Sequence, residues 1–303
     1  MPQTFYGPYD ERNQDYANSG NAHLGRFPLG HRLILPDDRE YRFTLNDGTV
    51  EVAGSLYQGV AAVADHLNRP ADVVRAIDVT LASATLTGTA AAIDIYTEGM
   101  MHVNEAAGEG YAYRIRRAFT AGAAHAASVA SGVLTVNFAP GEMLQVALTT
   151  ASLVTFTRNR YHQTTIHLGP PTAPLTGVSP GVAAADRFYW SQVKGYAAVL
   201  ASGTLLAGLP VMAGITTDGS VESVKRRIAT GGTTALVSTA THAVMRMLDS
   251  GGTTMDYFVI AGTAQTTIAG DISAGIANNA PQVGLCIKAN ASTEHALIDL
   301  DIA

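Results

Sequence analysis

Nine histidines and a single cysteine are the side chains of this sequence best suited to holding a metal ion or attacking a substrate. His162 and His167 lie five residues apart, and His23 and His31 stand on either side of a Pro-Leu-Gly turn. Neither spacing matches a known metal site, which uses two histidines one helical turn apart with a carboxylate, or a set of cysteines and histidines. We therefore expect no metal site and no cofactor.

The remaining reactive residues also lack a catalytic pattern. Asp37 and Asp38 fall in a predicted turn, where aspartates bond to their own backbone. Glu294 and His295 could form an acid and base pair, but an exposed turn is the simpler interpretation. Cys286 stands in an apolar run that favours a buried role, and one cysteine forms no intrachain disulfide. No nucleophile elbow, phosphate-binding loop or dinucleotide fingerprint occurs, so we predict a protein that is not an enzyme.

The composition favours a surface covered by partners. Charged residues are 15% of the chain, against about 25% in typical soluble domains. The net charge of −6 is modest, and the basic clusters at residues 114–117 and 225–227 are short. Direct binding of nucleic acid would call for a larger basic footprint, so we expect none.

The start of the chain resembles neither a signal peptide nor a membrane anchor. It has no charged segment followed by an apolar one, and no apolar run reaches the length of a membrane span. We therefore expect no association with a membrane, and we expect the protein to be made and assembled in the cytoplasm.

Strands are the elements expected to position any site. Residues 187–219 place the only tryptophan, Trp190, in a run of strand-forming residues that then breaks at two glycine-containing turns. Such punctuation is typical of short antiparallel strands. Two further strands are expected at residues 283–287 and 295–302, the second alternating between apolar and polar positions.

The first half of the chain also predicts β structure. Residues 32–45 are expected to form a hairpin, and residues 61–66 and 72–75 short helical turns. More strands are predicted at residues 76–81, 92–96, 99–103, 111–115, 133–138, 144–148, 153–156 and 164–168. This spacing predicts a mainly β fold of antiparallel sandwich or barrel-like domains with an extended N-terminal arm.

Proline and glycine suggest the domain organisation. We expect an extended arm over residues 1–30, a β-rich domain over 31–168 that opens with the hairpin, a Pro/Gly linker over 169–180, and a second β-rich domain over 181–303. Within the last domain, residues 241–249 fit a helix and a strand about equally well.

The arm carries three tyrosines, Tyr6, Tyr9 and Tyr16, in an otherwise polar segment. Tyrosine offers a large contact area at low entropic cost, so these residues could anchor the arm on a neighbouring subunit. A disordered terminus is the equally weighted alternative.

Several of these segments resemble structural proteins of tailed-bacteriophage virions, specifically capsid decoration or cement proteins. The resemblance is carried by patterns of strands and turns at residues 26–58, 105–111, 148–152, 187–219, 283–287 and 292–303. It spans most of the chain and contains no catalytic signature.

The resemblance implies a non-enzymatic protein on the capsid exterior that binds the major capsid protein of the same virion and stabilises the shell. It also implies a homotrimer. The residues expected to contact capsid or sister subunits are Tyr6, Tyr9, Tyr16, Phe27, Pro28 and Leu29. The alternative is a tail or fibre protein that binds a receptor or glycan, with Tyr189 or Tyr196 as the sugar contact. The lattice-forming shell protein itself also stays open, although the long helix of the common shell fold is not predicted.

Overall fold

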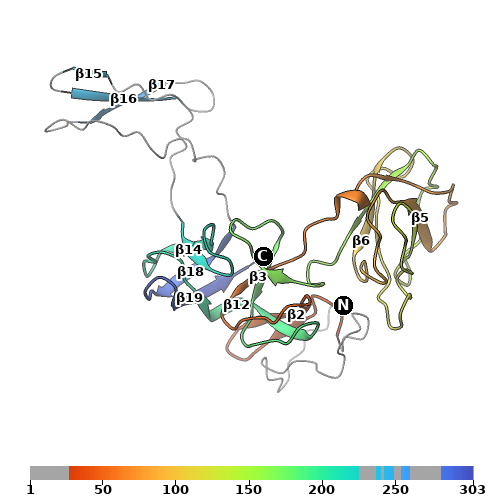
Figure 1. Ribbon diagram of the computed structural model, residues 1–303, viewed down its shortest axis with the longest axis horizontal. Coiled ribbons are helices and arrows are strands. Elements are labelled where there is room, and N and C mark those ends of the chain that lie inside the picture. The colour runs from red at the N-terminus through yellow and green to blue at the C-terminus, as the bar shows by residue number, and fades with distance from the viewer. Residues whose placement is uncertain (1–26, 225–236, 240–241, 249–253, 260–280, 303) are drawn as a thin grey trace. The chain divides into compact units, whose positions relative to one another are not determined.

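The computed structural model describes residues 27–224, 237–239, 242–248, 254–259 and 281–302 (Figure 1). The chain divides into two compact units, Met1–Ser223 with Pro281–Ala303, and Val224–Ala280. Both contain antiparallel sheets, and the only helical element among the described residues is one 3-10 turn, η2 (Ala64–His66). The prediction of a mainly β, sandwich or barrel-like fold is confirmed.

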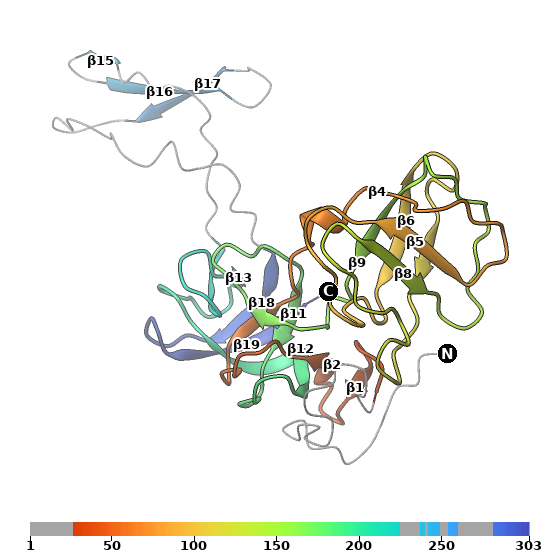
Figure 2. The ribbon, with the colours of Figure 1, turned by 45° about the vertical axis from the view of Figure 1, so that its right-hand side comes forward.

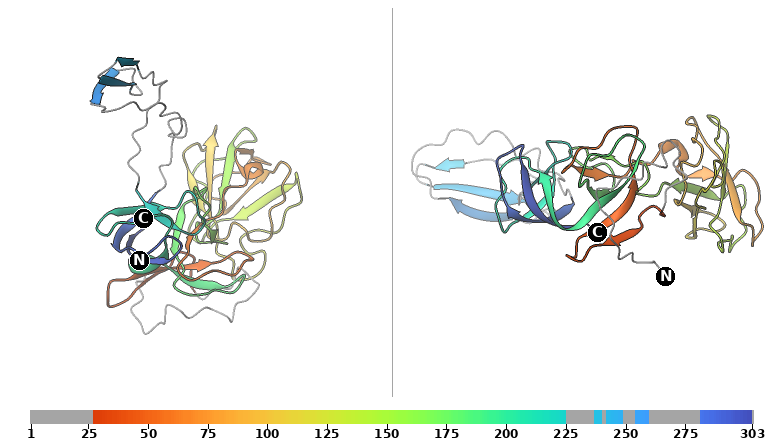
Figure 3. Two further views of the ribbon diagram at one scale, coloured as in Figure 1. Left: turned by 60° about the vertical axis from the view of Figure 1, so that its left-hand side comes forward. Right: turned by 90° about the horizontal axis from the view of Figure 1, so that it is seen from below.

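The first unit is built around a ten-stranded antiparallel sheet that curls into part of a barrel (Figures 2 and 3). Its strands follow the order β10-β3-β11-β12-β19-β18-β13-β14, while β1 pairs with β2 and β2 with β12. The strands of this sheet are β1 (Arg32–Ile34), β2 (Glu40–Leu45), β3 (Leu56–Gln58), β10 (Thr165–Ile166), β11 (Leu175–Val178), β12 (Phe188–Leu200), β13 (Pro210–Ala213), β14 (Val221–Ser223), β18 (Gln282–Lys288) and β19 (His295–Asp301). The predicted hairpin and the two C-terminal strands are therefore confirmed.

The thirteen-residue strand β12 holds this sheet together. Its first half pairs with β2 from Phe188 to Lys194, and its second half pairs with β19 from Lys194 to Leu200. A register shift between Gln192 and Lys194 marks the change of partner. Gly195 follows with a positive φ of 83°, a backbone conformation that favours glycine.

An aromatic cluster packs against the first half of β12. Trp190 lies 5.1 Å from Phe43 and 5.5 Å from Phe27, measured between ring centroids. Phe188 stacks on Phe43 at 5.1 Å. The cluster also contains Leu29, Leu33, Leu35, Tyr41 and Leu45. The strand predicted around Trp190 thus forms part of a core, as its composition indicated.

A second core in the same unit lies between shorter sheets. A four-stranded sheet runs β4-β9-β6-β7, and a two-stranded sheet pairs β5 with β8. Their bounds are β4 (Arg69–Pro70), β5 (Leu81–Thr85), β6 (Met100–Glu105), β7 (Ala112–Arg114), β8 (Val133–Asn137) and β9 (Leu153–Thr157). Buried side chains from all of these strands but β4, such as Phe156 of β9, fill this second core together with Tyr96 from a turn.

Four local predictions in this region are wrong. Residues 76–80 form a turn and a bend where a strand was predicted, with Asp78 at a positive φ of 65°, and the strand β5 begins only at Leu81. Residues 92–96 form turns, because the buried carboxylate of Asp94 accepts backbone N–H groups of Gly122, Ala124 and His125 and so organises a loop. Residues 144–148 make only an isolated bridge. Residues 72–75 form bends where a helical turn was predicted, whereas a 3-10 turn does occur within 61–66.

The predicted domain boundaries also need correction. The segment 169–180, predicted as a linker, contains β11, whose four residues are all buried between β3 and β12. Its prolines lie just before and just after that strand, so they do not interrupt it. Residues 27–30 belong to the folded unit, since Leu29 is buried in the aromatic cluster.

The second unit is an insertion between β14 and β18. Its described strands, β15 (Val237–Thr239), β16 (His242–Leu248) and β17 (Thr254–Val259), form one antiparallel sheet. The ambiguous segment 241–249 therefore contains a strand. The chain leaves the first unit after Ser223, which pairs with Val211, and returns at Gln282, which pairs with Met212. Both attachment points thus lie beside β13.

Candidate functional site

The structure places half of the predicted contact residues. Tyr6, Tyr9 and Tyr16 lie outside the described residues. Phe27 and Pro28 are half-buried, and Leu29 is 8% exposed within the aromatic cluster. Leu29 therefore supports the fold of its own chain, while the part of the arm left to reach a partner precedes Phe27.

Two polar contacts hold the start of the described chain against the second core. The backbone N–H of Leu29 donates to Glu98 Oε2 at 2.7 Å, and Arg117 donates to the carbonyl of Phe27 at 2.8 Å. Glu98 Oε1 also lies 3.7 Å from nitrogens of both Arg114 and Arg117. Burial raises the pKa of Glu98, and the Leu29 N–H and the two arginines oppose this shift. This attachment fixes the point from which residues 1–26 depart.

A partly apolar surface covers the outer side of β12, β19 and β18. Pairing places Ala198 beside Leu297, and Asp299 beside both Tyr196 and Leu285. Side chains of paired residues in antiparallel strands share one face. Tyr196 is 58% exposed, Leu285 39% and Leu297 37%. We call this surface, defined by Tyr196, Ala198, Leu285, Leu297 and Asp299, the outer face.

The opposite face of the same strands is buried. Ala197 pairs with Ile298, and Ile298 with Cys286. All three are less than 10% exposed. The predicted buried role of Cys286 is confirmed, and burial also raises the pKa of its thiol. The exposure of the outer face is therefore not a sign of a loose sheet, because its inner side is packed.

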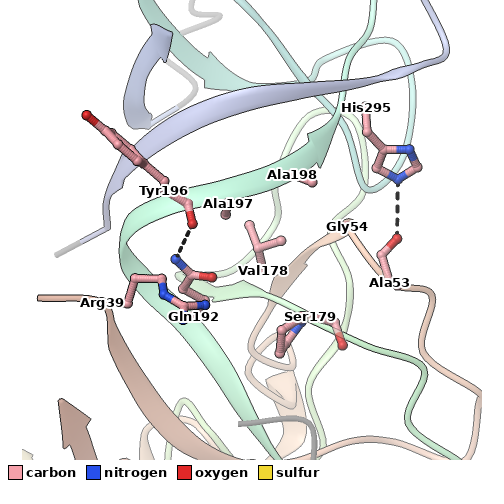
Figure 4. Close-up of a pocket in the computed structure, with 11 residues that line it drawn as sticks. Arg39, Ala53, Gly54, Val178, Ser179, Gln192, Tyr196, Ala197, Ala198 and His295 are labelled. Carbon is pink, nitrogen blue, oxygen red and sulfur yellow. Dashed lines mark hydrogen bonds between the residues drawn. The ribbon is translucent and has the colours of Figure 1, made fainter. Parts of the chain in front are cut away.

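A groove runs along the edge of the outer face beside β12 (Figure 4). One cavity of about 300 Å³ is lined by Arg39, Ala53, Gly54, Val178, Ser179, Pro180, Gln192, Tyr196, Ala197, Ala198 and His295. A neighbouring hollow of about 520 Å³ shares Arg39 and Tyr196 and adds Asp37, Asp38, Lys194, Gly195 and Asp299. The ring of Tyr196 points away from the first cavity in Figure 4, whereas the side chain of Gln192 lies inside it.

A buried acid lies behind this groove. Glu51 is 1% exposed, and burial raises its pKa well above the ordinary value; hydrogen bonds with Tyr189, Ser179 and Thr164 oppose the shift. Ser179 also lines the cavity. Tyr189, considered above as a sugar contact, is only 3% exposed. It cannot touch an external ligand, whereas Tyr196 can.

The residues with catalytic potential remain apart. Glu294 accepts from the backbone of Ala291, while His295 Nε2 lies 3.3 Å from the carbonyl of Ala53. His162 and His167 are both buried. Within the described ranges, no group of three or more His, Cys, Asp or Glu residues could hold a metal ion. The helical content of those ranges also includes no segment long and apolar enough to cross a membrane.

Comparison with known proteins returns no relative: no family model, curated protein or solved structure matches the chain.

Sequence reasoning did not find the outer face. One signal was present: in residues 295–301 the apolar positions 296, 298 and 300 alternate with polar ones, and Leu297 breaks the alternation. An apolar residue in the solvent-facing phase of a strand often marks a surface that binds something.

Proposed function

We propose that this protein is a non-enzymatic virion structural protein that binds the outer surface of a phage capsid and stabilises the shell. The observation that supports it best is the outer face, where exposed apolar side chains lie over strands whose other side is packed. Contiguous exposed apolar side chains among polar ones are characteristic of protein–protein contact surfaces. The resemblance of residues 26–58 and 187–219 to decoration proteins suggests the capsid as the partner.

In this proposal, binding energy comes from many weak contacts. A decoration protein that assembles as a trimer presents three copies of each surface to a repeating lattice. Simultaneous contacts then raise the overall affinity far above that of one copy. The N-terminal segment adds a second contact. Because the residues that follow it are bonded to Glu98 and Arg117, a segment bound to a partner would be firmly connected to the folded unit.

Co-sedimentation with expanded capsids of the same virus that lack this protein tests the proposal. The full chain should pellet with the capsids, and Leu297→Asp, which charges the outer face, should weaken binding by at least about tenfold. Glu109→Gln is the control, because Glu109 is exposed outside the outer face. Failure of the full chain to bind would overturn the proposal.

A second deletion sharpens that experiment. Removing residues 1–26 spares Leu29, whereas removing residues 1–30 would also delete part of the core. The shorter deletion should therefore reduce capsid binding without unfolding the protein. Unchanged binding would exclude the N-terminal segment as a contact.

One observation favours the glycan-binding alternative. Tyr196 is exposed beside Asp299 and lines a hollow with Lys194, so an aromatic ring stands next to hydrogen-bonding groups. Sugars stack on such rings and bond to such neighbours. Binding on a glycan array that disappears in Tyr196→Ala, without capsid binding, would favour this function over the first.

A further inference from the structure

Strand β12 has a short backbone edge without a partner strand. Ile302 donates its N–H to the carbonyl of Val193, on the side of β19, whereas Leu200 donates its N–H to Gly54 on the other side. Because successive residues of a strand point their backbone groups to opposite sides, Tyr196 and Ala198 share the side of Leu200. Their N–H and C=O groups therefore face away from β19.

The pairing on that side is interrupted rather than ended. Before the gap, Gln192 pairs with Val178 of β11. After it, Leu200 donates to Gly54, and Ser202 donates to the carbonyl of Val221. The unpaired stretch is thus a missing section within an otherwise continuous edge.

The side chain of Gln192 fills only part of this gap. Its Nε2 donates to the carbonyls of Lys194 at 3.1 Å and Tyr196 at 3.0 Å. Among the described residues, the N–H of Tyr196 and both backbone groups of Ala198 make no backbone hydrogen bond outside the strand ladders, and the alternation above turns them away from the β19 ladder. Exposed strand edges of this kind accept further strands readily.

The gap borders a cavity, although its Ala198 end lies close to Gly54, where an added Cβ would be 3.1 Å from the carbonyl oxygen of Ala198. The cavity of about 300 Å³ is lined by Ala197 and Ala198 on the β12 side, and by Gly54 and Val178 among its other walls (Figure 4). Small side chains leave the backbone accessible to another backbone. The volume is at the lower limit for ligand pockets, about 300 Å³, which suits a few residues of extended chain.

We propose that residues 1–26 of a second copy of this chain add a short strand to β12 at Tyr196 and Ala198. This rests on the proposed function and names what the N-terminal segment binds. A peptide backbone offers donors and acceptors at the strand spacing that the gap presents. Extended, 26 residues reach up to about 85 Å, enough to leave one copy and meet another.

A second copy is the favoured source because each chain carries one such segment and, on the described part of β12, one such gap. Exchange around a closed ring then pairs every open edge. The three tyrosines of the segment supply contact area next to the exposed ring of Tyr196. If residues 1–26 bound to β12 of their own chain instead, they would not link one copy of the protein to another.

Sedimentation velocity of the free protein tests this inference. The full chain should form an oligomer, and removal of residues 1–26 should yield monomers. Ala198→Pro removes the unpaired N–H without touching a β19 hydrogen bond and should also yield monomers. Ala198→Ser keeps the N–H and should behave like the wild type. A full chain that is monomeric, or an oligomer indifferent to both changes, would overturn the proposal.

Peptide binding gives a second, independent readout. A fluorescent peptide of residues 1–26 should bind the chain that lacks them, at least about tenfold more tightly than it binds the same chain with Ala198→Pro. Trp190 fluorescence checks that each variant is folded. If Ala198→Pro fails to fold, Ala53→Phe obstructs the same cavity from the opposite wall, keeps Trp190 as the sole tryptophan and should weaken peptide binding to a similar extent. Equal affinity for obstructed and open edges would overturn the proposal.

The outcome stays separate from the capsid experiment. If removal of residues 1–26 abolishes capsid binding but leaves self-association intact, the segment binds capsid protein and this inference fails while the proposed function stands. If the free protein exchanges its segments but never binds capsids, the inference stands and the proposed function fails.

Discussion

The two halves of β12 share one backbone but have different surroundings. From Phe188 to Val193 every side chain is buried, because the aromatic cluster covers one face and the residues around Glu51 the other. From Lys194 to Leu200 buried and exposed positions alternate. The first half is thus committed to the core, whereas the second has one face and one edge left for binding.

The comparison separates stability from recognition. Substitutions in the first half should act on folding, and substitutions in the second half on association. The boundary between the two halves of β12 is marked by the register shift between Gln192 and Lys194 and by the positive φ of Gly195.

The largest effect is expected from Phe188→Ala. Phe188 is 1% exposed and stacks on Phe43, so its removal should leave a cavity and lower the free energy of unfolding by about 3 to 5 kcal/mol. Urea unfolding followed by Trp190 fluorescence measures this. A loss below about 1 kcal/mol would contradict the assignment of this half to the core.

Gly195→Ala tests the boundary between the halves. A side chain at its positive φ is strained, and an added Cβ would lie 3.0 Å from Arg39 Cγ. We expect a loss of about 1 to 2 kcal/mol in the same assay. Gly203→Ala is the matched control, since Gly203 has a similar φ but no atom within 4 Å of an added Cβ. Equal losses would mean that the Arg39 contact costs nothing.

Glu51→Gln tests the polar side of the buried half through its pH dependence. Burial raises the folded-state pKa of Glu51, so the folded protein binds this proton more tightly than the unfolded chain does. The contribution of this proton to the free energy of unfolding is fully present below the pKa of Glu51 in the unfolded chain, about 4.3. It is lost as the pH rises through the pKa of Glu51 in the folded protein.

The glutamine variant stays neutral at every pH. It should match the wild type near pH 4 and have the larger free energy of unfolding at pH 8, by a margin that grows as the pH rises toward the folded-state pKa of Glu51. Urea midpoints at several pH values give the difference, and Glu109→Gln at an exposed position should show none. The pKa of Glu98 is also raised, but Glu98 is present in all these proteins, so its contribution to the pH dependence cancels in the difference between variant and wild type. A difference independent of pH would refute a neutral, buried Glu51.

The smallest effect on stability is expected from Tyr196→Ala. Its side chain is 58% exposed, so the unfolding free energy should change by less than about 0.5 kcal/mol. Association should nevertheless weaken, whichever of the proposed partners binds there. A large loss of stability with unchanged association would reverse the comparison between the two halves.

The sequence predicted much of the fold for a physical reason. A strand with one packed face produces an alternating or aromatic-rich sequence pattern. Such patterns around Trp190 and at residues 295–302 therefore predicted strands correctly. Residues 92–96 misled the prediction because the hydrogen bonds of Asp94 to residues 122–125 are long-range, so no local pattern contains them. The linker prediction at 169–180 failed similarly, since the prolines flank β11 and its burial depends on distant β3 and β12.

The candidate site was less accessible to prediction. Its groove joins residues from five separated segments, around positions 39, 53, 179, 196 and 295. The gap in the edge exists only because β11 pairs with β12 before it and Gly54 bonds to β12 after it. A single sequence contains none of these distances. The one local signal was Leu297, an apolar residue at a position where the alternating pattern of the strand calls for a polar one.

The insertion beside β13 has a consequence for how this protein can change. Ser223 and Gln282 pair with adjacent residues of the same strand from opposite sides, so the two cut points are about two strand spacings, roughly 10 Å, apart. A loop or a foreign domain with closely spaced ends could replace residues 224–280 without altering the register of the sheet. The position is therefore one at which evolution or protein engineering could exchange the inserted domain while the ten-stranded sheet is retained.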